Sequence, residues 1–177
     1  MRLEPLLEPE RTLVVEDPGD AEGVLERVAA LGARACGSAC DTGTLLETLR
    51  EREGTYPTST AEGVAFPHAV LEQVGETIVV ALLLRKGVKF PASGGDGKGS
   101  VAGAVGGSAA GSPAGGGHEV DLVFGMFGPA SKPFQHVRLL ARLARVVHSE
   151  SARRRLRGAA GDAEFLERLV EEDRSHG

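Results

Sequence analysis

Residues 77–84 read Thr-Ile-Val-Val-Ala-Leu-Leu-Leu, an uninterrupted apolar run that begins with β-branched side chains. A strand of this composition is buried on both faces, so the fold must cover both sides of a sheet. Residues 120–127, Val-Asp-Leu-Val-Phe-Gly-Met-Phe, fit a second such strand, and residues 12–15 fit an edge strand. With 41% hydrophobic residues, the 177-residue chain is long enough for one packed domain.

Five segments around these strands have apolar residues at helical spacing. Asp20 and Asp41 are candidate N-caps of the first two helices, which should end near Gly32 and near Arg52. The later helices have candidate caps at Ser131 or a neighbour, at Ser149 or Ser151, and at Asp162. The stripe of the third helix is expected to consist of Val137, Leu140, Ala141, Ala144 and Val147. Helices before and after the strands predict an α/β fold, a mixed β-sheet sandwiched by helices.

Residues 92–117 differ from the rest of the chain because Gly, Ala and Ser dominate them. Such a segment cannot bury enough apolar surface to offset its ordering entropy, so we expect a flexible loop. It lacks the large anchor side chains that a partner-binding arm would need. We therefore predict a single domain spanning residues 1–177, with a core at about residues 6–170.

Charge and composition exclude several classes of function. The net charge of −5 and the absence of a basic patch argue against nucleic-acid binding. No stretch approaches the roughly 20 apolar residues of a membrane span. The first ten residues carry acids where a signal peptide would be basic and then apolar. We expect a cytoplasmic protein that does not insert into a membrane.

Cys36 and Cys40 form the only cysteine pair, in Ala-Cys-Gly-Ser-Ala-Cys. The gap is not the two-residue gap of zinc ribbons or thioredoxin-like sites. We expect two reduced cysteines in a connection between helices.

Residues 52–68 hold the strongest functional signal. The short apolar run at residues 64–66 reads as a strand end, and Pro67 then fixes its own φ and offers no N–H. His68 directly after this rigid stop should be held at the rim of the sheet. A lone histidine is more often a surface or capping residue. Arg52 and the hydroxyl-rich residues 55–60 nevertheless add the cation and donors that hold a phosphoryl group near a nitrogen nucleophile.

This stretch resembles the enzyme IIA domain of the bacterial phosphoenolpyruvate-dependent sugar phosphotransferase system, of the fructose/mannitol and nitrogen-regulatory type. The matching parts are Arg-Glu at residues 52–53, a turn threonine at Thr58 and Gly-Val-Ala-Phe-Pro-His at residues 63–68. The turn departs from the family pattern, because Pro57 replaces a serine and Ser59 and Ala61 replace glycines. We expect a stiffer loop with the nucleophile and the cation unchanged.

A second segment, residues 134–148, is similar to the family's second histidine and the helix after it, and places His136 at that histidine. Read without the family, His136 is an ordinary residue near a helix start. The resemblance covers about residues 6–169 and implies the same α/β architecture. The family joins the two central strands by a shorter connection, so the loop at residues 92–117 is predicted to be an insert.

The resemblance implies a phosphoryl relay without metal or cofactor. His68 would be the phosphorylated nucleophile, Arg52 would stabilise the phosphoryl charge, Thr58 would donate to its oxygens, and His136 would orient it by a hydrogen bond. The structural alternatives are a helix C-terminal charge for Arg52 and a simple turn role for Thr58. A metal site built from the two histidines lacks nearby carboxylate or thiolate ligands.

The implied donor is HPr or its nitrogen-branch relative, a phosphohistidine protein. The implied acceptor is an enzyme IIB with a cysteine. The alternative is a regulatory binding module, degenerate or of the nitrogen-regulatory type, that acts on a transporter or kinase through protein–protein contact.

Overall fold

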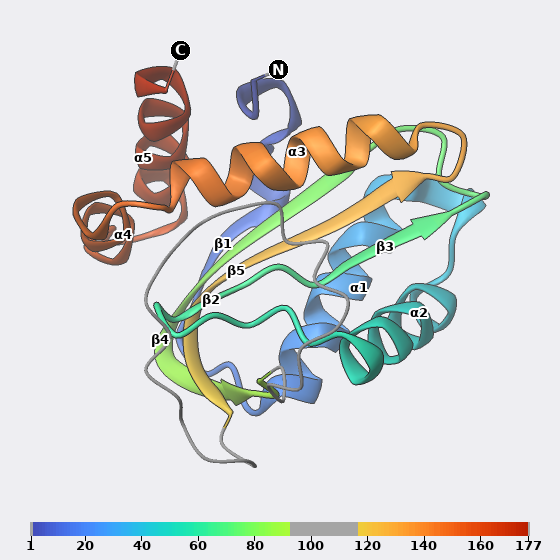
Figure 1. The fold of residues 1–177 in the computed structure, drawn as a ribbon, viewed down its shortest axis with the longest axis horizontal. Coiled ribbons are helices and arrows are strands. Elements are labelled where there is room, and N and C mark those ends of the chain that lie inside the picture. The colour runs from blue at the N-terminus through green and yellow to red at the C-terminus, as the bar shows by residue number, and fades with distance from the viewer. Residues whose placement is uncertain (1, 93–116, 177) are drawn as a thin grey trace.

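A mixed β-sheet forms the middle layer of the fold (Figure 1). The computed structural model describes residues 2–92 and 117–176. The strands are β1 (Thr12–Val15), β2 (Val64–Ala65), β3 (His68–Leu71), β4 (Ile78–Phe90) and β5 (His118–Pro129). Their order is β1-β4-β5-β2, with β3 also paired to β5. Only β4 and β5 run antiparallel, whereas the pairs β1–β4, β2–β5 and β3–β5 are parallel.

Helices cover both faces of this sheet (Figure 1). Two helices, α1 (Ala21–Cys36) and α2 (Thr42–Thr55), lie on one face. The other face carries α3 (Pro133–Val146), α4 (Glu150–Arg157) and α5 (Asp162–Ser175). Short 3₁₀ turns occupy Glu4–Leu6, Pro9–Arg11 and Gly37–Ala39. The predicted α/β fold with a mixed sheet between helices is therefore confirmed.

Two apolar cores result, one on each face of the sheet. The alternation along β4 explains them, because Val80 and Leu82 join the core under α1 and α2 while Val79 and Leu83 join the opposite one. Both sets of side chains are fully or almost fully buried, as the uninterrupted apolar run at residues 77–84 predicted.

Glycines allow α1 to lie very close to β5. A Cβ on Gly32 would stand 2.3 Å from a ring carbon of Phe127, and one on Gly125 would stand 2.3 Å from a methyl group of Val28. The sequence predicted that the helix ends near Gly32, but Gly32 lies inside it. The helix continues for one more turn to Cys36.

Two other sequence expectations need correction. The helix that opens after Asp41 continues beyond Arg52 to Thr55. The last helix is capped by Gly161, because the Asp162 carboxylate instead accepts the Val14 amide at 2.6 Å. The long helix α3 has Lys132, the neighbour of Ser131, at its N-cap, which agrees with the sequence. Ser149 caps α4 as predicted, by accepting the Ala152 amide.

The buried stripe of α3 also differs from the prediction. It consists of His136, Leu139, Arg142, Leu143 and Val146. Of the predicted stripe, Val137 is exposed, whereas Val147 is buried just beyond the helix and Leu140 is partly buried. There is a buried ion pair in which the Arg142 guanidinium donates to the Asp173 carboxylate at 2.6 Å. Arg142 therefore lies on the buried face of the helix together with Leu139 and Leu143.

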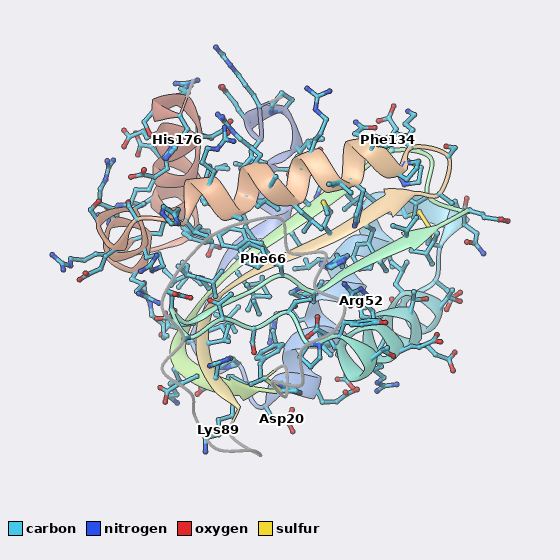
Figure 2. The ribbon with its side chains drawn as sticks, viewed as in Figure 1. Asp20, Arg52, Phe66, Lys89, Phe134 and His176 are labelled. Carbon is cyan, nitrogen blue, oxygen red and sulfur yellow. A yellow bond between two sulfur atoms is a disulfide. The ribbon has the colours of Figure 1, made fainter. Side chains whose placement is uncertain are left out.

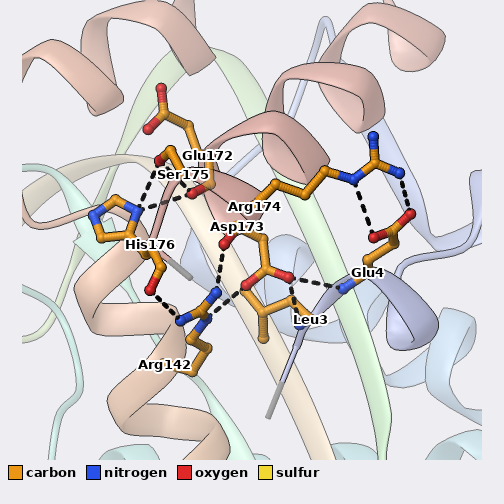
Figure 3. A network of polar contacts seen from close by, with 8 residues as sticks. All are labelled: Leu3, Glu4, Arg142, Glu172, Asp173, Arg174, Ser175 and His176. Atoms are coloured by element: carbon orange, nitrogen blue, oxygen red, sulfur yellow. Dashed lines mark hydrogen bonds and ion pairs between the residues drawn. The ribbon is translucent and has the colours of Figure 1, made fainter.

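Asp173 is the centre of a polar network that joins the N-terminal segment to α3 and α5 (Figure 3). Its side chain is fully buried and also accepts the backbone amides of Leu3 at 2.7 Å and Glu4 at 3.2 Å. Glu4 pairs with Arg174 beside it. Because every oxygen of the buried carboxylate has a donor, the charge is compensated inside the fold.

Cys36 and Cys40 are joined by a disulfide, which corrects the expectation of two reduced thiols. The Gly37–Ala39 turn brings their Cα atoms within 5.7 Å, a separation that a disulfide spans. The position between α1 and α2 agrees with the sequence reading.

The expected insert at residues 92–117 lies almost wholly outside the described residues, because residues 93–116 are not described. Among the helices of the described ranges, none has the length and apolar character needed to cross a membrane.

Candidate functional site

The site is built around the edge strands β2 and β3, which lie one after the other along the same side of β5. Val64 is aligned with Leu122, and His68 is aligned with Met126. Pro67 lies between the two strands and accepts the Met126 amide at 3.0 Å. A proline is tolerated here because this edge position needs no donor toward β5. β3 was not expected as a strand from the sequence.

The residue before this proline faces away from β5, because backbone groups in a strand alternate in direction. Phe66 therefore has an amide and a carbonyl that no neighbouring strand pairs. The Thr58 hydroxyl accepts the Phe66 amide at 3.2 Å, and the His68 ring contacts the Phe66 carbonyl at 2.8 Å. Gly63 starts this segment with a φ of +82°, a conformation that favours glycine.

His68 is held in one tautomer by this contact. A carbonyl oxygen can only accept a hydrogen bond, so Nδ1 carries the proton and donates it to Phe66. Nε2 then retains its lone pair. Burial lowers the pKa of the half-buried ring, and the charge of Arg52 lowers it further, against the opposing effect of the Phe66 hydrogen bond. The neutral, nucleophilic form is therefore favoured at neutral pH.

His136 lies beside His68, with the ring centroids 5.2 Å apart. It comes from the first turns of α3 and is only 6% exposed. Within the described part of the chain, neither of its ring nitrogens has a hydrogen-bond partner. Burial, with smaller effects of His68 and Arg52, lowers its pKa to about 4. A Cβ on Gly128 would approach the His136 ring nitrogen to 2.6 Å, so glycine leaves the room that this ring occupies.

Arg52 lies in the last turn of α2, where a cation also suits the helix dipole. Its guanidinium donates to the Tyr56 carbonyl at 2.9 Å and lies 5.1 Å from the centre of the Tyr56 ring. Its positive charge lowers the pKa of both histidines, so the three groups share one electrostatic environment. Its side chain has no carboxylate partner among the described residues.

Thr58 lies in the loop after α2, and both of its hydrogen-bond donors bond to Glu53. The Thr58 hydroxyl donates to Glu53 Oε1 at 2.5 Å and its amide donates to Glu53 Oε2 at 3.1 Å. Glu53 is only 4% exposed, and burial raises its pKa against the lowering effect of these hydrogen bonds. In this arrangement neither Thr58 donor points to a ligand.

The structure thus brings His68, His136 and Arg52 into one site. Thr58 is linked to His68 through the backbone of Phe66. Glu53 and Gly128 were missed from the sequence. Glu53 was visible as the acid of the Arg-Glu motif, but nothing local predicted its burial. In the described ranges, no set of three His, Cys, Asp or Glu side chains gathers as a metal site.

Large exposed apolar side chains lie close in the sequence to Arg52, His68 and His136. Tyr56 is four residues beyond Arg52, Val70 is two residues beyond His68, and Phe134 and Val137 flank His136 on α3. Phe134 is the most exposed of the four, at 84%. Figure 2 shows Arg52 at the end of α2 and Phe134 at the start of α3. These four residues are referred to below as the apolar rim.

Comparison with known proteins identifies the family of this chain. The family model described as Phosphoenolpyruvate-dependent sugar phosphotransferase system, EIIA 2, matches residues 6–172. The chain belongs to this EIIA type 2 family, as the resemblance of residues 52–68 and 134–148 indicated. A nitrogen regulatory protein of Pseudomonas aeruginosa is 32% identical over 170 residues, which is 96% of this chain and 95% of that protein.

Solved structures agree on the fold. The nitrogen regulatory protein IIA-Ntr from Neisseria meningitidis has a TM-score of 0.74 at 21% identity, over 94% of this chain and 98% of that one. The enzyme IIA of the mannitol system from Escherichia coli, solved in complex with phosphorylated enzyme IIB, has a TM-score of 0.65 at 19% identity. That comparison covers 93% of this chain and 97% of the other.

Proposed function

We propose that this protein is a phosphocarrier whose His68 accepts a phosphoryl group through Nε2. The observation that carries the proposal is the Nδ1–Phe66 hydrogen bond, because it leaves Nε2 with the free lone pair. The depressed pKa of His68 supports it, since only the neutral ring is a nucleophile.

The proposed donor is a phosphohistidine protein, HPr or its nitrogen-branch relative. The Nε2 lone pair of His68 forms the new N–P bond, and the electron pair of the broken P–N bond returns to the donor ring. When the other nitrogen of that ring carries a proton, the donor leaves as neutral imidazole. His68 becomes a phosphorylated imidazolium whose Nδ1–H remains bonded to Phe66. The reaction exchanges one N–P bond for another, so positioning and charge screening suffice.

The neighbouring side chains have distinct proposed roles. Arg52 offers a permanent cation and a planar fork to the equatorial oxygens. His136 is neutral above its pKa of about 4 and so can donate one N–H without adding a second positive charge. Its two unpaired ring nitrogens support this role, since buried polar groups are usually paired. Thr58 is proposed to act on the phosphoryl group through the loop that it anchors.

The proposed acceptor is the cysteine of an enzyme IIB, or a regulated transporter or kinase that responds to the phosphorylated state. The mannitol relative is named in complex with phosphorylated enzyme IIB, and the 32% identical relative is named a nitrogen regulatory protein. The second name favours regulation as the alternative function. The apolar rim supports docking of a transient partner in either case.

The test is phosphoryl transfer from phosphoenolpyruvate through enzyme I and a phosphocarrier, read by intact mass. We expect an acid-labile gain of one phosphoryl group that His68→Ala removes. His148→Ala is the matched control, because this exposed histidine lies at the far end of α3. Normal labelling of His68→Ala would refute the nucleophile. No labelling of the unmodified protein by active upstream proteins would favour a module that acts by binding alone.

A further inference from the structure

Glu53 is a buried carboxylate with no direct contact to the two histidines. It follows Arg52 in α2, and adjacent helical residues point about 100° apart. Arg52 is therefore half-exposed in the site while Glu53 turns under the loop at 4% exposure. A buried carboxylate is costly unless donors satisfy it, and Thr58 supplies two.

The hydrogen bonds continue from Glu53 to the nucleophile. The Thr58 hydroxyl donates to Glu53 and so presents its lone pairs to the Phe66 amide. The carbonyl of the same Phe66 accepts from Nδ1 of His68. Pro67, which follows, accepts the Met126 amide through its own carbonyl. Both outward backbone groups of Phe66 are thus fixed by side chains, one linked to Glu53 and the other belonging to His68.

We propose that Glu53 is a positioning residue: through Thr58 and the backbone of Phe66 it holds His68 in the tautomer and orientation that present Nε2. The proposal rests on the phosphocarrier function for its catalytic consequence. It assigns Thr58 to this chain of contacts instead of to direct donation to the phosphoryl group. A shift of the Phe66 carbonyl would release the ring to rotate, which exchanges Nε2 with a ring carbon.

The test compares Thr58→Val with Thr58→Ser. Valine keeps the shape of threonine and removes the hydroxyl, whereas serine keeps it. Thr48→Val is the control, because the Thr48 hydroxyl donates to the Thr44 carbonyl within α2 and lies outside the loop that holds Thr58. Glu53→Gln keeps one acceptor oxygen but places an NH2 donor where the other oxygen accepted from Thr58, so it should fall between Thr58→Val and the unmodified protein.

Two readouts separate positioning from stability. The first is the His68 tautomer, read from two-bond ¹H–¹⁵N correlations of the ring in the unphosphorylated protein. The second is the phosphoryl transfer rate at saturating donor. For Thr58→Val we expect a loss of the single Nδ1–H tautomer and a rate about tenfold lower, with the half-saturating donor concentration unchanged. Thr58→Ser should restore both.

An unchanged tautomer and a rate within about twofold in folded Thr58→Val would overturn the role of Glu53. The tautomer is measured without any phosphoryl donor. If it shifts in Thr58→Val and the unmodified protein accepts no phosphoryl group, the phosphocarrier function fails while the positioning chain stands. If the unmodified protein is labelled and the tautomer does not shift, only the positioning chain fails.

Discussion

The buried imidazole of His136 makes the stability of this protein depend on pH. Its pKa is lowered to about 4 in the folded chain, against about 6.5 in an unfolded one. Between these values the unfolded state binds a proton that the folded state does not. Stability is therefore lost as pH falls from 6.5 toward 4.

We expect His136 to contribute a loss of about 2 kcal/mol in unfolding free energy between pH 7 and pH 5. Urea unfolding at both pH values measures it, with His136→Gln as the comparison. His68 contributes with the same sign, because its pKa is also lowered, so the variant should lose only part of the dependence. An identical loss in His136→Gln would show that the ring titrates normally. A phosphoryl group on His68 should raise the pKa of His136 by adding negative charge.

At the level of single residues, the sequence predicted much of the site but not the supporting residues Glu53 and Gly128. His68, Arg52 and His136 were found because a motif and a second histidine segment carry them. Their roles remain predictions. Glu53 and Gly128 act through contacts with the loop after α2 and with α3, and no local pattern signals such a partner. Thr58 was predicted as a site residue, but nothing in the sequence indicated that its donors bond to Glu53, five residues away.

At the level of the elements, the packing of α1 on β5 depends on one glycine in each of them, and each glycine faces a side chain of the other element. Gly32→Ala should reduce the unfolding free energy by about 1–3 kcal/mol, because the new methyl group meets the Phe127 ring. Gly54→Ala in α2 is the matched control, since nothing lies within 4 Å of its Cβ position. That change should stabilise by up to about 1 kcal/mol through helix propensity. Equal effects of the two substitutions would contradict the close approach.

Element types were predictable, whereas their exact bounds and faces depended on distant residues. The two apolar runs fixed β4 and β5, and caps located α1, α2 and α4. The predicted stripe of α3 was partly wrong, because it left out Arg142, whose acidic partner lies 31 residues away. β3 escaped prediction because it is short and follows a proline, and it exists only by pairing with β5.

At the scale of the whole molecule, we expect partner proteins to bind through the apolar rim. Phe134→Ser should raise the half-saturating donor concentration about tenfold, because large aromatic anchors dominate small interfaces. The melting temperature should not change, since this side chain is 84% exposed. Arg145→Ser, on the last turn of the same helix, is the control and should leave both quantities unchanged. A lower maximal rate without a change in half-saturation would place Phe134 in the chemistry instead.

The Asp173 network also has a consequence for how the chain folds as it is synthesised. The amide of Leu3 bonds a carboxylate 170 residues later, so at about 5–20 residues per second it waits roughly 10–30 s for its acceptor. Until α5 leaves the ribosome, Leu3 and Leu7 have no complete core to enter. We therefore expect the core under α1 and α2 to form first. The core on the opposite face should form last, and the N-terminal segment should be the last part to pack against it.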